Sequence, residues 1–217
     1  MTLLELKKSV MDIIGEDSTT PTYWTSANDI ELEEHINDAI AEICLLTGQH
    51  TDELHLPLYA SRSYYHLDAG KGGELLYMKR VRVYPEGYSL EQTDPAQLTR
   101  EDYLWMTRTG VPFRFYLVNG DILRTVPMES DGGRSLECLA ATIPPRYTED
   151  DEVVDVTTET RGWIVAYTSY MMFLTLRRLD KANLWYKTYT QLSGFDKADD
   201  GKYVGRLIKL KELDASK

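Results

Sequence analysis

The spacing of apolar residues changes twice along the chain. In residues 1–48 apolar side chains recur every three or four positions, which is typical of one face of an α-helix. Across residues 51–147 apolar and polar side chains alternate in short runs, as in β-strands, and helical spacing returns over residues 155–195. The pattern predicts an α+β fold, in which N-terminal helices and a long C-terminal helix form a bundle around a central antiparallel β-meander or sandwich insertion.

End signals define the first helix. Thr2 and Glu5 have the spacing of a capping box, in which each side chain bonds an amide that the helix leaves unpaired. Gly15 supplies a left-handed stop. The first helix is therefore expected at residues 3–14.

A second helix is expected at about residues 29–47. Ser26 or Asn28 can cap its start, and Gly48 can end it. Its acidic face is interpreted as a solvated helix face.

The central region contains short β-rich runs and turn signals. We expect strands at 54–58, 63–67, 75–84 and 135–143, and a short helix near 95–107. The glycine-rich segment 70–73 lacks the spacing of a phosphate-binding loop and is expected to be a turn.

Asn119-Gly120 is the clearest local signal, because this pair supplies the positive φ angles of a type I′ turn between two alternating runs. It predicts a β-hairpin over residues 113–126. In the register of a two-residue loop, one face of the hairpin would carry Phe113, Phe115, Leu117, Ile122, Arg124 and Val126.

The most apolar helix is expected to start at Thr157 or Thr158 and to continue to about residue 178. Residues 181–192 form either its extension or a further helix that ends at Gly194. An aromatic stripe on this helix is interpreted as core or as a subunit interface, and consists of Trp163, Tyr167, Tyr170 and Leu174.

One domain is expected over residues 1–195, followed by a C-terminal arm, 196–217. The chain has 35 acidic and 24 basic side chains, so most of its surface should repel DNA phosphates. From residue 201 onward, however, five basic residues outnumber two acidic ones, which suits an acidic partner. The apolar run 163–176 is shorter than the roughly 20 residues that span a bilayer, so no membrane contact is expected.

No residue pattern points to catalysis or to a cofactor. His35, His50, His55 and His66 lack the spacing of a metal or catalytic site and are expected at the surface. The two cysteines, Cys44 and Cys138, are expected to be buried thiols.

The acidic run 149–152 is expected to be a solvated loop. The alternative is a small hydrolase that uses Glu149 and Asp151 as acid and base. A regulatory binding module, which would form a small discrete oligomer, is a third possibility.

Several sequence features occur in a recognisable order. The segment Ile-Asn-Asp-Ala-Ile at 36–40 is followed by Leu-Pro at 56–57, by Gly-Val-Pro-Phe at 110–113 ahead of the hairpin, and by Pro-Pro at 144–145 before the long aromatic helix. In this order the chain resembles the head-to-tail connector, or adaptor, proteins of tailed phages.

The resemblance implies a structural virion protein of the neck, assembled in the host cytoplasm, and not an enzyme. About twelve copies would form a ring beneath the portal protein, with tail or nozzle proteins on the other side and DNA passing through the channel without specific binding. A tail-completion or tail-terminator protein is the alternative within virion structure, and the hydrolase alternative would be virion-associated.

The C-terminal arm is expected to order on the portal, which would offset its loss of chain entropy by apolar burial. The residues expected to bind the portal are Phe195, Tyr203, Arg206, Leu207, Ile208 and Leu210.

Overall fold

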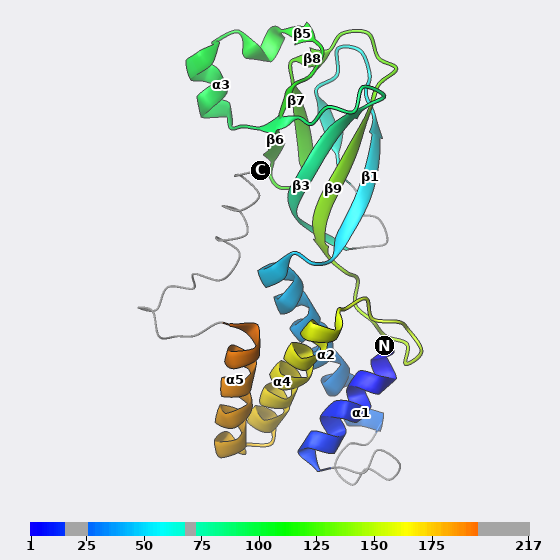
Figure 1. Cartoon of the computed structure of the whole chain (residues 1–217), viewed down its shortest axis with the longest axis vertical. Helices are drawn as coiled ribbons and strands as arrows, with labels where there is room; N and C mark the ends of the chain where they lie inside the picture. The colour runs from blue at the N-terminus through cyan, green and yellow to red at the C-terminus, as the bar shows by residue number, and fades with distance from the viewer. Residues whose placement is uncertain (16–25, 68–72, 195–217) are drawn as a thin grey trace. The chain divides into compact units, whose positions relative to one another are not determined.

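A computed structural model describes residues 1–15, 26–67 and 73–194. Helices and β-sheets occur together, which confirms the predicted α+β class (Figure 1). The chain divides into two compact units, one from Met1–Gly48 and Arg146–Lys217 and the other from Gln49–Pro145. We refer to them as the helical unit and the sheet unit. The turn expected at 70–73 lies largely outside the described residues.

Helix α1 spans Leu3–Ile14, as predicted. The Thr2 hydroxyl accepts a hydrogen bond from the Glu5 amide at 3.3 Å, and the Glu5 carboxylate accepts one from the Thr2 amide at 3.1 Å. The helix ends at Gly15, whose φ of 86° is accessible to glycine at little cost. The first helix and both of its end signals are therefore confirmed.

Helix α2 spans Ser26–Thr47 and begins earlier than predicted. Ser26 and Asn28 lie within the first turn of the helix, so neither residue precedes it as a cap. Apolar periodicity could not place this start, because the first turn of a helix needs no buried face. The side chains of residues 26–28 are not among those described.

Helix α4 spans Thr158–Thr175 and helix α5 spans Leu179–Ser193, so the C-terminal pattern forms two helices and not one extended helix. Thr157 caps α4 through its hydroxyl, which accepts a hydrogen bond from the Thr160 amide. Between the helices Arg177 has a φ of 55°, which interrupts helical geometry. Gly194 ends α5, as predicted.

Helix α4 lies at the centre of the helical unit and contacts α1, α2 and α5 (Figure 1). Its Ile164, Met172 and Phe173 side chains are buried. The other helices contribute buried apolar residues from one face each, among them Leu6 and Val10 of α1, Ile36 and Ile43 of α2, and Ala182 and Tyr189 of α5.

A buried lysine joins three segments of this unit. The Lys7 side chain of α1 is only 4% exposed, and its ammonium group lies 3.0 Å from the Asp29 carboxylate, 3.3 Å from that of Glu33 and 2.9 Å from that of Asp150. Burial alone would lower the pKa of Lys7, but the hydrogen bonds to Asp150 and Asp29 outweigh it and raise the pKa. Charge and hydrogen bonding thus hold α1 to α2 and to the loop before α4.

Four further hydrogen bonds hold the same loop in place. The Asn37 side chain of α2 pairs with the Tyr147 backbone, donating to its carbonyl at 2.9 Å and accepting from its amide at 2.8 Å. The amides of Leu3 and Leu4 donate to the carbonyls of Glu152 and Asp150. Residues 149–152 do form a loop, as predicted, but Asp150 is engaged with Lys7.

The sheet unit contains a three-stranded antiparallel sheet of order β1-β9-β3. These strands are β1 Thr51–Pro57, β9 Ser135–Ile143 and β3 Glu74–Tyr84. The strand predicted at 135–143 is confirmed. It lies between β1 and β3, however, and does not continue the hairpin as a meander strand would.

The second sheet has the order β2-β7-β6-β4. Its strands are β2 Tyr64–His66, β7 Ile122–Val126, β6 Arg114–Val118 and β4 Glu91–Gln92. Strand β4 runs parallel to β6, and a separate short pair, β5 Thr109–Gly110 with β8 Met128–Glu129, is also parallel. The expectation of purely antiparallel strands was therefore wrong at these two pairs.

The short helix predicted near 95–107 is divided in two. Helix α3 spans Pro95–Glu101, and a single 3₁₀ turn, η1, spans Trp105–Thr107. Asp94 caps α3 by accepting a hydrogen bond from the Gln97 amide at 2.8 Å. The helix stops at Asp102, whose backbone is extended.

The β6–β7 hairpin forms where Asn119-Gly120 predicted it, and both residues have positive φ angles. Val118 pairs with Ile122, however, so three residues connect the strands instead of two. One additional residue changes the face on which every side chain of a strand lies. The predicted shared face was therefore wrong.

In the observed register, Phe115 and Leu117 share a face with Leu123, whereas Tyr116 shares the other face with Arg124 and Val126. The first face packs into the core between the two sheets, and the second forms a smaller cluster with Leu98 and Trp105. Both faces of the hairpin are therefore covered within the sheet unit.

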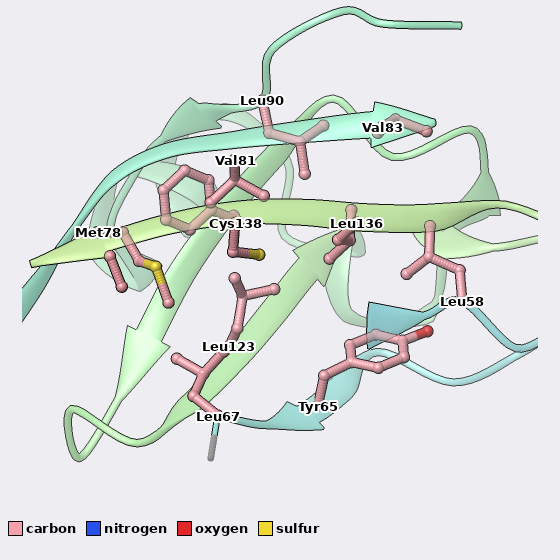
Figure 2. Packing of buried hydrophobic residues seen from close by; sticks show 12 residues of the cluster. Leu58, Tyr65, Leu67, Met78, Val81, Val83, Leu90, Leu123, Leu136 and Cys138 are labelled. Carbon is pink, nitrogen blue, oxygen red and sulfur yellow. The ribbon is translucent and has the colours of Figure 1, made fainter. Parts of the chain in front are cut away.

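The two sheets share one hydrophobic core (Figure 2). Val81 of β3 and Leu136 and Cys138 of β9 approach it from one sheet, and Tyr65 of β2 and Leu123 of β7 approach it from the other. Burial raises the pKa of the Cys138 thiol to about 12, so this cysteine is a packing residue. Cys44 is also buried, as expected.

Replacing Lys7 with methionine tests the role of the buried ion cluster. We expect Lys7→Met to lower the free energy of unfolding by about 1–3 kcal/mol at neutral pH, because three carboxylates lose a charged donor. The exposed Lys8 of the same helix provides the matched control, and Lys8→Met should change it by less than about 0.5 kcal/mol. Urea unfolding monitored by circular dichroism measures both.

The raised pKa of Lys7 also predicts how this contribution depends on pH. It should be fully present from neutral pH up to the ordinary lysine pKa of about 10.5, and should be lost as the pH rises through the raised native value. Equal stability of the wild type and Lys7→Met at neutral pH would contradict this role.

Candidate interaction surfaces

Three of the four stripe residues predicted on α4 are aromatic, and two of them face α5. The rings of Tyr167 and Tyr189 meet edge to face with centroids 5.2 Å apart, and those of Tyr170 and Tyr186 lie 5.0 Å apart. Tyr167 and Tyr170 also contact each other at 6.1 Å. These four tyrosines form a continuous row between the two helices.

The remaining stripe residues differ in exposure. Trp163 is buried, whereas Leu174 is half-buried. Burial, followed by the nearby charges of Glu42 and Asp38, raises the pKa of Tyr167. The stripe therefore lies among the helices of one chain, with Tyr167, Tyr170 and Leu174 still partly open to solvent.

The helices that surround α4 carry several large apolar side chains that are exposed. On α2 these are Ile30 and Leu45, and on α5 they are Leu179, Leu184 and Leu192. All five side chains are more than two-fifths exposed, which leaves them able to contact another molecule.

A cationic side chain lies within an aromatic cluster of the sheet unit. Arg124 is 9% exposed, and its guanidinium lies 4.4 Å from the ring centroid of Tyr64 and 4.9 Å from that of Trp105. It also donates a hydrogen bond to the Tyr116 hydroxyl at 3.0 Å. Among the described residues it makes no ion pair with a carboxylate, so aromatic faces provide its main stabilising contacts.

Trp105 anchors an otherwise exposed apolar segment. Its ring packs edge to face on Tyr116 with centroids 5.8 Å apart, and its indole N–H donates to the Thr99 hydroxyl at 3.2 Å. The neighbouring large side chains point to solvent, and they are Tyr103, Leu104, Met106, Val111 and Phe113. We call residues 103–113 the apolar segment. It is a second surface at which an apolar partner could dock.

The histidines differ from the expectation that all four lie at the surface. His55 and His66 are exposed, as predicted, but His35 and His50 are half-buried. His50 Nδ1 lies 2.8 Å from the Thr142 hydroxyl, which in turn donates to Asp52. The Thr142 amide also donates to the His50 carbonyl, just before β1. These contacts therefore hold the start of β1 against the end of β9.

The described residues contain no cluster of three or more histidine, cysteine or acidic side chains suited to a metal ion. Within the same ranges, no helix has the length and apolar character needed to cross a bilayer. Glu149 and Asp151, the acid and base of the hydrolase alternative, lie in an exposed loop.

The residues expected to bind the portal protein, Phe195 and those from Tyr203 to Leu210, lie outside the described residues. Sequence reasoning missed two other groups. Lys7 and Arg124 each lie at a position where the spacing of apolar residues predicts a buried side chain. A charged residue at such a position was the sequence signal that could have identified them.

Replacing Trp105 with alanine tests whether it anchors the apolar segment. We expect Trp105→Ala to destabilise the protein by about 3–5 kcal/mol, because it leaves a cavity beside Arg124 and Tyr116. Met106→Ala is the matched control and should change the stability by less than about 0.5 kcal/mol, since Met106 is 53% exposed. Chemical unfolding measures the stability of both variants. A similar loss of stability in the two would contradict an anchoring role for Trp105.

Comparison with known proteins bears on what these surfaces are for. A search of curated proteins gives no match. The model of the SU10 adaptor protein family, in contrast, matches residues 1–207, which is nearly the whole chain. This match confirms the resemblance to phage head-to-tail adaptors that the order of sequence features suggested. The chain therefore belongs to the SU10 adaptor protein family.

Proposed function

We propose that this protein is the adaptor subunit of a phage head-to-tail connector, and that it assembles as a ring of about twelve copies beneath the portal protein. The ring joins the portal to tail or nozzle proteins and forms part of the conduit through which DNA passes. Membership of the SU10 adaptor protein family carries the proposal. It implies a structural protein of the virion rather than an enzyme.

The exposed apolar side chains of both units support this assignment. A protein that acts alone seldom leaves several large apolar residues of one short segment in water, as the apolar segment 103–113 does. A connector subunit must contact copies of itself and two kinds of neighbour, so it needs more than one such surface.

The charge of the chain suits a conduit. Its formal net charge is −11, so the surface as a whole repels DNA phosphates instead of holding them. Passage of DNA requires that the wall does not bind it tightly, because each neutralised phosphate adds affinity.

The basic C-terminal arm is assigned to the portal. It combines the basic residues Arg206 and Lys209 with the apolar residues Tyr203, Leu207 and Ile208, so it can contribute both charge and apolar burial to an interface. The helical unit, to which the arm belongs, would then also lie near the portal.

Deleting residues 196–217 tests the portal assignment. We expect the truncated protein to keep the circular dichroism spectrum and cooperative unfolding of the full chain, and to lose retention on purified heads that carry the portal. Co-sedimentation with such heads measures retention, with portal-free heads as the control.

Undiminished retention of the truncated protein would contradict the role of the arm. Co-sedimentation with isolated tails, and not with portal-bearing heads, would instead favour a tail-completion protein.

A further inference from the structure

Two helix faces of the helical unit carry opposite charge. On α2, the side chains at the solvent-facing positions 31, 34, 38 and 42 are all acidic, and Ile30 and Leu45 lie on the same face near its ends. Residues 34, 38 and 45 are exposed, whereas 31 and 42 are half-buried. We call this the acidic α2 face.

The corresponding surface of α5 is basic. Lys181 and Lys187 are exposed on it together with Leu184, and the exposed Arg177 and Arg178 precede the helix. Asp180 is the acidic residue of the first helical turn, where it suits the positive end of the helix dipole. We call this the basic α5 face.

The fold holds both faces outward. Leu32, Ile36 and Ile43 bury the opposite side of α2, and Ala182 and Tyr189 bury the opposite side of α5. Each helix packs on α4, and Figure 1 shows α5 alongside α4 in the helical unit. Neither face can turn inward without exposing its own buried side chains.

Only some of the charged side chains on the two faces form contacts within the chain. Asp38 lies 3.3 Å from Arg146 in an exposed pair, and Lys181 lies over the ring of Phe173. Glu31 is 3.9 Å from His35. For Glu34 and Lys187 the described residues provide no such contact. An exposed pair such as Asp38 with Arg146 contributes little and can be exchanged for a better partner.

From this complementarity we infer that the acidic α2 face of one copy docks on the basic α5 face of the next copy. The occupant of each face is thus a second copy of this chain. Apolar residues at the same faces, Ile30 and Leu45 against Leu184, supply the buried area, and the charges fix the register and the orientation.

Such a contact has consequences for assembly. Because the two faces differ, the interface is head to tail, and repeating it generates a closed ring when the rotation per subunit permits. A pair of identical faces would instead give a dimer and stop. The inference rests on the proposed ring function and names the surfaces that close the ring.

A charge-reversal experiment tests the pairing. One variant carries Glu34→Lys and Asp38→Lys on α2, and the other carries Lys181→Glu and Lys187→Glu on α5. All four positions are exposed, so both variants should fold, and thermal unfolding verifies this. The copies of each protein retained per portal-bearing head are counted after sedimentation.

We expect each variant alone to lose retained copies roughly tenfold, because like charges then face each other. An equal mixture of the two should restore retention close to that of the wild type. In an alternating ring the reversed α2 face meets a reversed α5 face, and the unaltered faces meet each other. Control reversals at exposed positions of α1, Lys8→Glu and Asp12→Lys, should retain wild-type binding.

Several outcomes would overturn the inference. Wild-type retention of both single-face variants would place the contact between copies elsewhere, while leaving the adaptor function intact. Loss in the α5 variant alone, without rescue by the mixture, would identify the portal as the partner of that face. Failure of the wild type itself to bind portal-bearing heads would contradict the proposed function instead.

Discussion

The helical unit depends on the need to cover α4, which is apolar on most of its circumference. Helices α1, α2 and α5 each bury one face against it, and the tyrosine row fills the contact with α5. Because one side of α2 and of α5 packs against α4, the opposite side of each helix points outward. The charge and apolar character of the outward faces are then available for other molecules, which links the packing of one subunit to assembly.

Polar contacts set the geometry that packing alone would leave loose. The Lys7 ammonium group binds two carboxylates of α2 and one of the loop that precedes α4. Asn37 forms hydrogen bonds with the backbone of the same loop. In the sheet unit, Arg124 has an equivalent role among aromatic rings. Buried cations need directional partners, so they define how neighbouring segments lie more sharply than apolar contacts do.

Local signals predicted elements well and relations between elements less well. The capping box, Gly15 and Gly194 placed helix ends because each acts within one turn, and strand 135–143 followed from its alternation. The set of side chains on one hairpin face was predicted wrongly, because a third loop residue changes the register without altering either strand. The position of β9 between β1 and β3 depends on long-range pairing, which no local sequence pattern contains. The stripe on α4 could be read from helical spacing, but its contacts with tyrosines of α5 and the complementary charge of α2 and α5 could not, because they depend on which sides of the helices face each other.

Both the proposed adaptor function and the proposed contact between copies require this chain to be a component of the phage neck. Imaging of purified particles carrying a label on this protein measures that directly. The account predicts multiple copies, confined to the vertex where head meets tail and absent from the rest of the capsid. Finding the label throughout the capsid, along the tail tube or nowhere in the finished particle would contradict it.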